Sequence, residues 1–161
     1  MKKQQLQETI DFLRLKGITT PEVGIVLGTG LGKLVAEIEI EKEIAYSDIP
    51  NFPVATVEFH SGKLIYGILS GKKVVVMAGR FHLYEGYNPW EVTYGIRTMH
   101  GLGIKNLLVS NAAGAINLNY KKGDLMLIDD HINLQGSSPL AFQGASDFGT
   151  IFADMLAPYS K

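Results

Sequence analysis

Apolar residues recur along the chain with two different periods. Leu6, Ile10 and Leu13 follow one another at helical spacing, and Gly17 comes after them as a left-handed stop. This pattern predicts an amphipathic helix over residues 4–16. The later apolar runs are short enough for strands, at residues 23–27, 64–69, 74–78, 107–109 and 125–128. Their almost wholly apolar composition is typical of strands covered on both faces.

Turn and cap residues divide these runs. Residues 70–73 (Ser-Gly-Lys-Lys) separate two of them and predict a hairpin. Asn88 and Pro89 have the order of a helix cap and a first helical residue, and they predict a helix over 89–101. We therefore expect an α/β fold with a mixed, largely parallel central sheet flanked by helices, in one domain over residues 1–161. In such sheets, ligands bind beyond the carboxyl ends of the strands.

Composition and charge narrow the classes of function. The 161 residues carry 15 Lys and Arg against 16 Asp and Glu, and they include no Cys. A balanced charge disfavours partners such as nucleic acid or a membrane surface, which need clustered positive charge. The apolar runs are well below the ~20 residues of a membrane helix. The missing cysteines exclude thiolate catalysis and Cys-ligated zinc, and they favour a cytoplasmic location.

A glycine loop, Gly28-Thr29-Gly30-Leu31-Gly32, follows the first apolar run directly. Its glycines let backbone amides approach an anion, and Thr29 adds a hydroxyl donor. The loop matches neither nucleotide fingerprint, because Lys33 stands in place of a third glycine and Leu34 follows that lysine. A tight turn after a buried strand is the alternative interpretation.

The segment Gly79-Arg80-Phe81-His82-Leu83-Tyr84-Glu85-Gly86-Tyr87 follows another apolar run. If it is extended, Arg80, His82 and Tyr84 share one face, because alternate side chains of a strand point the same way. That face suits an oxyanion beside a sugar hydroxyl, since Arg offers a planar donor fork. The alternative is a solvated strand end in which Glu85 only pairs with Arg80.

Other polar residues carry weaker signals. Residues 111–114 (Asn-Ala-Ala-Gly) follow a strand and can present backbone amides to an anion. His60 lies in a loop and can add a positive group, whereas we expect His100 to pack or cap its helix. The run Asp129-Asp130-His131 lacks the spacing of a ligand set, so we expect no metal. A Gly-x-Ser-x-Gly nucleophile elbow is also missing.

Taken together and in this order, five segments resemble purine nucleoside phosphorylase of the trimeric type: residues 28–32, 60–62, 79–87, 111–114 and 123–134. The resemblance extends from the first helix to Phe152. It implies a nucleoside phosphorylase-like fold and cleavage of the N-glycosidic bond of purine (deoxy)ribonucleosides by inorganic phosphate, which yields the free base and the sugar 1-phosphate. It also implies that the reaction uses no metal or organic cofactor and that phosphate is the second substrate.

The resemblance also assigns roles to residues. Phosphate binding falls to Thr29, His60, Arg80, His82 and the Ala112 amide. His82 and Glu85 form the catalytic pair, in which Glu85 orients the cluster. Tyr84 contacts the ribose, and Phe152 from a neighbouring subunit of a homotrimer closes over the sugar.

The sequence departs from the family pattern in three respects. Thr29 replaces a Ser, Ala115 replaces a Gly, and the chain is truncated on the C-terminal side. The residues that bind and protonate the purine are then expected after Lys161. If the 161 residues act alone, we expect a half-site that binds phosphate weakly and does not activate a purine. The alternatives are a catalytically incomplete phosphate-binding fragment and a relative of 5′-methylthioadenosine phosphorylase.

Overall fold

The computed structural model describes residues 1–54 and 62–160. The chain forms two compact units, Met1–Ala112 and Ala113–Lys161. The first unit holds the α-helices and strands of the described residues, and these are α1 (Lys2–Leu15), β1 (Val23–Val26), β2 (Glu39–Ala45), β3 (Lys63–Leu69), β4 (Lys72–Ala78), α2 (Pro89–Leu102) and β5 (Asn106–Val109). Short 3₁₀ helices cover Gly32–Glu37, Tyr46–Asp48 and Leu83–Glu85, and a fourth, Ala145–Phe148, lies in the second unit. The expectation of one domain stays a prediction.

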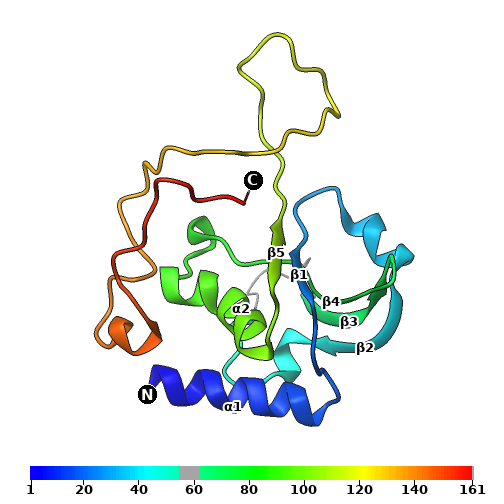
Figure 1. Ribbon diagram of the computed structural model, residues 1–161, viewed down its shortest axis with the longest axis vertical. Helices are drawn as coiled ribbons and strands as arrows, with labels where there is room; N and C mark the ends of the chain where they lie inside the picture. Colours follow the sequence, from blue (N-terminus) through cyan, green and yellow to red (C-terminus); the bar gives the residue numbers. More distant parts are fainter. Residues whose placement is uncertain (55–61, 161) are drawn as a thin grey trace. The chain divides into compact units, whose positions relative to one another are not determined.

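The strands form a mixed sheet in the order β2-β3-β4-β1-β5 (Figure 1). β1 runs parallel to β4 and to β5, whereas β3 pairs antiparallel with β2 and with β4. The mixed α/β sheet and the predicted hairpin of β3 and β4 are therefore confirmed. Because β4, β1 and β5 are parallel, their carboxyl ends meet at one edge of the sheet. The segments after these three strands start from that edge.

Both faces of the sheet are covered. On one face, α2 packs so closely that a Cβ on Gly24 of β1 would lie 2.8 Å from the Met99 sulfur. On the other face, the buried side chains of Ile25, Val76 and Ile65 form a core with Leu34 of the 3₁₀ helix Gly32–Glu37. Alternate residues of β1 thus point into different layers, as the pleat of a strand requires.

The two α-helices lie within two residues of their predicted bounds, since α1 covers Lys2–Leu15 rather than 4–16 and α2 covers Pro89–Leu102 rather than 89–101. Gly17 follows α1 with φ +93°, the left-handed conformation expected of a stop. Asn88 caps α2, since its side-chain oxygen accepts from the Glu91 amide at 3.1 Å while the Glu91 carboxylate accepts from the Asn88 amide at 2.8 Å. The helices pack on each other, and the Thr9 hydroxyl lies 2.8 Å from that of Tyr94. No helix among the described residues is long and apolar enough to span a membrane.

Two strand expectations need correction, and one strand was not expected. Residues 106–109 do form a strand, but it is exposed rather than buried, with 59% of Leu108 accessible. Residues 125–128 form no strand, and Leu125 is 95% exposed. β5 is the edge strand of the described sheet, and the run at 125–128 pairs with no strand of the described residues. β2 was not predicted, because its residues are mostly charged and exposed.

Candidate functional site

The strand-end segment after β4 turns instead of continuing as a strand. Gly79 takes φ +106°, a left-handed conformation that favours glycine, and residues 83–85 form a 3₁₀ helix. The expected extended geometry, in which Arg80, His82 and Tyr84 alternate along one strand, is therefore wrong. The turn nevertheless brings these three side chains together.

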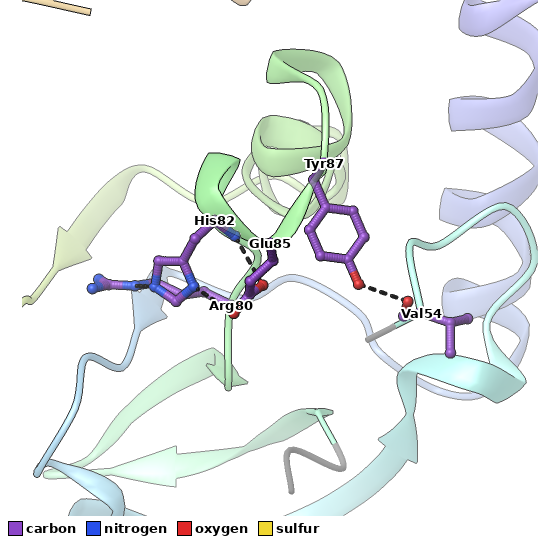
Figure 2. Close-up of polar contacts among 5 residues, drawn as sticks. All are labelled: Val54, Arg80, His82, Glu85 and Tyr87. Atoms are coloured by element: carbon purple, nitrogen blue, oxygen red, sulfur yellow. Dashed lines mark hydrogen bonds and ion pairs between the residues drawn. The ribbon is translucent and has the colours of Figure 1, made fainter. Parts of the chain in front are cut away.

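Arg80, His82 and Glu85 form a continuous chain of hydrogen bonds (Figure 2). The Arg80 Nε–H donates to His82 Nε2 at 3.0 Å. Since that imidazole nitrogen accepts, the proton of a neutral ring sits on Nδ1, which donates to Glu85 Oε1 at 2.9 Å. The other carboxylate oxygen accepts from the His82 backbone amide at 3.2 Å. Glu85 thus fixes both the orientation and the tautomer of His82.

This arrangement contradicts the alternative in which Glu85 only pairs with Arg80. The carboxylate contacts His82, and both of these side chains are largely shielded, with 28% and 16% exposure. Arg80 instead directs Nη1 to the backbone carbonyl of Ser110 at 2.6 Å. A guanidinium carries five N–H donors, so bonds from Nε and Nη1 leave it capacity for an anion.

Tyr84 stacks on the His82 ring, with ring centroids 4.7 Å apart and planes inclined by 19°. It is 83% exposed, so most of its surface faces solvent. A phenol in this position can cover one side of a ligand held by His82 and offer a hydroxyl to it. Tyr87 has a structural contact, since its hydroxyl donates to the Val54 carbonyl at 2.7 Å (Figure 2).

The glycine loop and the segment after β5 meet at the carboxyl ends of β1 and β5. The Gly28 amide donates to the Ser110 hydroxyl at 2.8 Å, and that hydroxyl donates to the Val26 carbonyl at 3.2 Å. A Cβ on Gly28 would collide with the Ser110 carbonyl and lie 2.8 Å from Asn111 Cα. Thr29 follows Gly28 and is exposed, and Ala112 comes two residues after Ser110. Each end of this contact thus lies within two residues of one that is predicted to bind phosphate.

Two other predicted residues cannot be placed in this cluster. His60 lies outside the described residues. Phe152 belongs to the second unit and is 84% exposed. His100 is exposed at the end of α2, where its carbonyl accepts from the Gly103 amide.

The run 129–131 shows no ligand set. His131 Nδ1 lies 3.1 Å from the Tyr159 hydroxyl, and its amide donates to the Asp130 carboxylate at 2.8 Å. In the part of the chain that the structure describes, no group of three or more His, Asp or Glu residues is placed to hold a metal.

Sequence reasoning missed two residues that organise the site. Ser110 joins Gly28 to Arg80, and Tyr46 donates its hydroxyl to the Gly79 carbonyl at 2.7 Å. Both contacts connect residues more than 25 positions apart, so no local pattern reveals them. The one available signal is that Ser110 stands at the end of an apolar run, just before Asn111.

Replacing Tyr46 by Phe tests how much the hydrogen bond to the Gly79 carbonyl stabilises the segment after β4. Tyr46 is buried, and burial raises the pKa of its hydroxyl well above the ordinary value, so the group remains a donor at working pH. We expect Tyr46→Phe to lower the free energy of unfolding in urea by about 0.5–1.5 kcal/mol, the net value of one hydrogen bond. Tyr84→Phe, which alters an exposed hydroxyl, should change it by less than about 0.5 kcal/mol. Equal losses would contradict the structural role of Tyr46.

The site as a whole has the features of an anion-binding α/β protein. A glycine loop, a fixed guanidinium and a carboxylate-oriented imidazole lie together beyond the carboxyl ends of parallel strands. The particular family follows from comparison with known sequences: the chain belongs to the phosphorylase superfamily, whose sequence model matches residues 22–161.

Known relatives and structures agree with this family. Purine nucleoside phosphorylase 1 of Geobacillus stearothermophilus is 50% identical over 161 residues, which cover 100% of this chain and 59% of that protein. A Schistosoma mansoni purine nucleoside phosphorylase, isoform 2, in complex with cytosine and ribose-1-phosphate superposes with a TM-score of 0.87 at 42% identity, over 94% of this chain and 54% of that one.

A schistosoma purine nucleoside phosphorylase in complex with hypoxanthine gives a TM-score of 0.89 at 43% identity, over 97% of this chain and 56% of that one. These values confirm the nucleoside phosphorylase fold. The chain spans little more than half the length of the relatives it matches.

Proposed function

We propose that this chain contributes the phosphate and ribose part of the active site of a purine nucleoside phosphorylase. The reaction splits the N-glycosidic bond of a purine (deoxy)ribonucleoside with inorganic phosphate and yields the base and the sugar 1-phosphate. The observation that carries the proposal is the chain of hydrogen bonds from Ser110 through Arg80 and His82 to Glu85. The named relatives, one solved with ribose-1-phosphate and one with hypoxanthine, support the choice of substrate class.

The proposed chemistry needs an anion held in one position. As the glycosidic bond breaks, positive charge develops on the sugar ring, and a fixed phosphate below the anomeric carbon stabilises that charge. The same phosphate then forms the new bond, so its orientation lowers the entropic part of the barrier. In the proposal, Arg80, Thr29 and the Ala112 amide position this reactant, and phosphate binding is also assigned to His60.

His82 acts in the proposal through its pairing with Glu85. The Glu85 carboxylate lies 2.9 Å from Nδ1 and holds the imidazole in one orientation beside Arg80. The N–H donors of the Arg80 guanidinium that are not bonded to His82 or Ser110 can donate to phosphate oxygens. Tyr84 stacks on His82, and this position supports the proposal that it contacts the ribose.

The remaining parts of the proposal concern groups outside the described cluster. The purine-binding residues are expected beyond position 161. In a homotrimer, Phe152 of a neighbouring subunit would cover the sugar, and the exposure of this side chain is compatible with such a contact. The protein is proposed to work in the cytoplasm without metal or organic cofactor, since phosphate itself is the second substrate.

The alternatives differ in what they bind and turn over. The reported relatives are named purine nucleoside phosphorylases, so a 5′-methylthioadenosine phosphorylase is not favoured. A catalytically incomplete phosphate-binding fragment differs from the complete enzyme in turnover and not in phosphate binding. Assays of the two properties therefore distinguish these cases.

The proposed function is tested by assaying inosine phosphorolysis and phosphate binding with the 161-residue chain. We expect calorimetry to detect phosphate binding and the assay to detect no hypoxanthine release, because the base-binding residues are proposed to lie elsewhere. Turnover close to that of the Geobacillus stearothermophilus relative would contradict this division of the site. An absence of phosphate binding would contradict the phosphate assignment.

A further inference from the structure

The contact between β1 and β5 departs from a regular parallel ladder one residue after the strands end. The ladder pairs Val26 with Val109, and the Ser110 amide continues it by donating to the Val26 carbonyl at 3.1 Å. In a regular parallel ladder the next bond runs from the Gly28 amide to the Ser110 carbonyl. Here the Ser110 hydroxyl accepts from the Gly28 amide instead, at 2.8 Å.

Because the hydroxyl takes this bond, the Ser110 carbonyl accepts a hydrogen bond from a different donor. The carbonyl accepts from Arg80 Nη1 at 2.6 Å rather than from Gly28. The hydroxyl is fully used, since it accepts from Gly28 and donates to the Val26 carbonyl at 3.2 Å. The Ser110 side chain therefore makes the last hydrogen bond of the ladder, and the Ser110 carbonyl is left to accept from Arg80.

We propose that Ser110 is a positioning residue, whose hydroxyl replaces its own carbonyl in the β1–β5 ladder so that the carbonyl can hold Arg80. It also fixes the first glycine of the loop that leads to Thr29. The inference rests on the proposed phosphate site for its functional consequence, and it goes beyond that site because Ser110 itself donates nothing to the anion. Without the hydroxyl, the Gly28 amide either competes with Arg80 for the carbonyl or loses its partner.

The test compares Ser110→Thr with Ser110→Val in the 161-residue chain. The two side chains have nearly the same shape, and only Thr keeps the hydroxyl, so a difference between them reports the hydrogen bonds and not the packing. Ser110→Ala is the third variant, and Ser47→Ala is the control, because the Ser47 hydroxyl contacts the neighbouring exposed Asp48 at 3.3 Å. Thermal unfolding of every variant shows whether it is folded.

Two readouts are measured by NMR. The first readout combines the hydrogen-exchange rate of the Gly28 amide with the chemical shift of the Arg80 Nε–H, and both are measured without ligand. We expect exchange about tenfold faster in the Val and Ala variants than in the wild type, with the Arg80 signal shifted, and wild-type behaviour in the Thr variant. The second is titration with inorganic phosphate, where we expect the dissociation constant to rise about tenfold in the Val and Ala variants alone.

The outcomes separate this inference from the proposed function. If the wild-type chain binds no phosphate, the proposed function fails, while the Gly28 exchange and the Arg80 signal still decide the role of Ser110. If the Thr and Val variants show the same Gly28 exchange, the inference is wrong. It is also wrong if phosphate binds equally well to both.

Discussion

Arg80→Ala should weaken phosphate binding by about 1.5–3 kcal/mol, or roughly 10- to 150-fold in dissociation constant. The guanidinium is held in place by its bonds to His82 and to the Ser110 carbonyl, so it meets an anion without first losing side-chain freedom. Its removal also frees His82 Nε2 from a donor that keeps this nitrogen an acceptor. Isothermal titration of the chain with inorganic phosphate measures the change directly.

Two further variants make this result specific. Arg80→Lys keeps the charge but not the planar fork, so we expect its affinity for phosphate to lie between those of the wild type and the Ala variant. His100→Ala removes an exposed imidazole at the end of α2 and should leave phosphate binding unchanged. If Arg80→Ala and His100→Ala have the same effect, the anion site lies elsewhere.

Gly28→Ala should destabilise the protein by about 1–3 kcal/mol, because the new methyl group would clash with backbone atoms, which cannot move aside as a flexible side chain can. Its Cβ would collide with the Ser110 carbonyl and lie 2.8 Å from Asn111 Cα, and neither atom belongs to a flexible side chain. Relief requires β1 and β5 to separate at their carboxyl ends. That movement would also break the bond from the Gly28 amide to Ser110 and shift the acceptor of Arg80. Urea unfolding measures the loss of stability, and a phosphate titration of the folded variant should show weaker binding.

Gly32→Ala is the matched control in the same loop. Nothing lies within 4 Å of a Cβ at Gly32, and the residue has no left-handed backbone angle. We expect its unfolding free energy to stay within about 0.5 kcal/mol of the wild type. If both glycine variants are equally stable, the close approach of Gly28 to Ser110 is not a feature of the folded protein.

The sequence predicted those elements whose signals are local. The cap of α2 was predicted because Asn88 and Pro89 stand next to each other, and the stop of α1 because Gly17 follows the last apolar position. The hairpin of β3 and β4 was predicted from two apolar runs around a polar turn. In each of these cases the residues that determine the structure are only a few positions apart.

The errors arise where a strand depends on its neighbours. The run at 125–128 has a strand's composition, but a strand also needs a hydrogen-bonding partner, and the described residues offer none there. β2 is the reverse case, since its charged residues conceal a strand that exists because β3 pairs with it. The exposure of β5 likewise follows from its position at the edge, which its apolar sequence does not encode.

In the candidate site, too, contacts between residues close in sequence could be expected, and contacts between distant residues could not. Arg80, His82 and Glu85 lie within six residues, so their association could be expected from the sequence, although the turn that brings them together could not. The bonds from Ser110 to Gly28 and Arg80 join residues 82 and 30 positions apart. They depend on the register of β1 against β5, which only the folded structure reveals.

The central claim is that the glycine loop, Arg80 with His82, and the segment after β5 hold one anion together. An NMR titration with inorganic phosphate tests it most directly, following the amides of Thr29 and Ala112 and the Nε–H of Arg80. The account predicts that all three signals shift with a single dissociation constant and that sulfate displaces phosphate from all of them. Signals that respond at different phosphate concentrations, or a response confined to one of the three places, would contradict it.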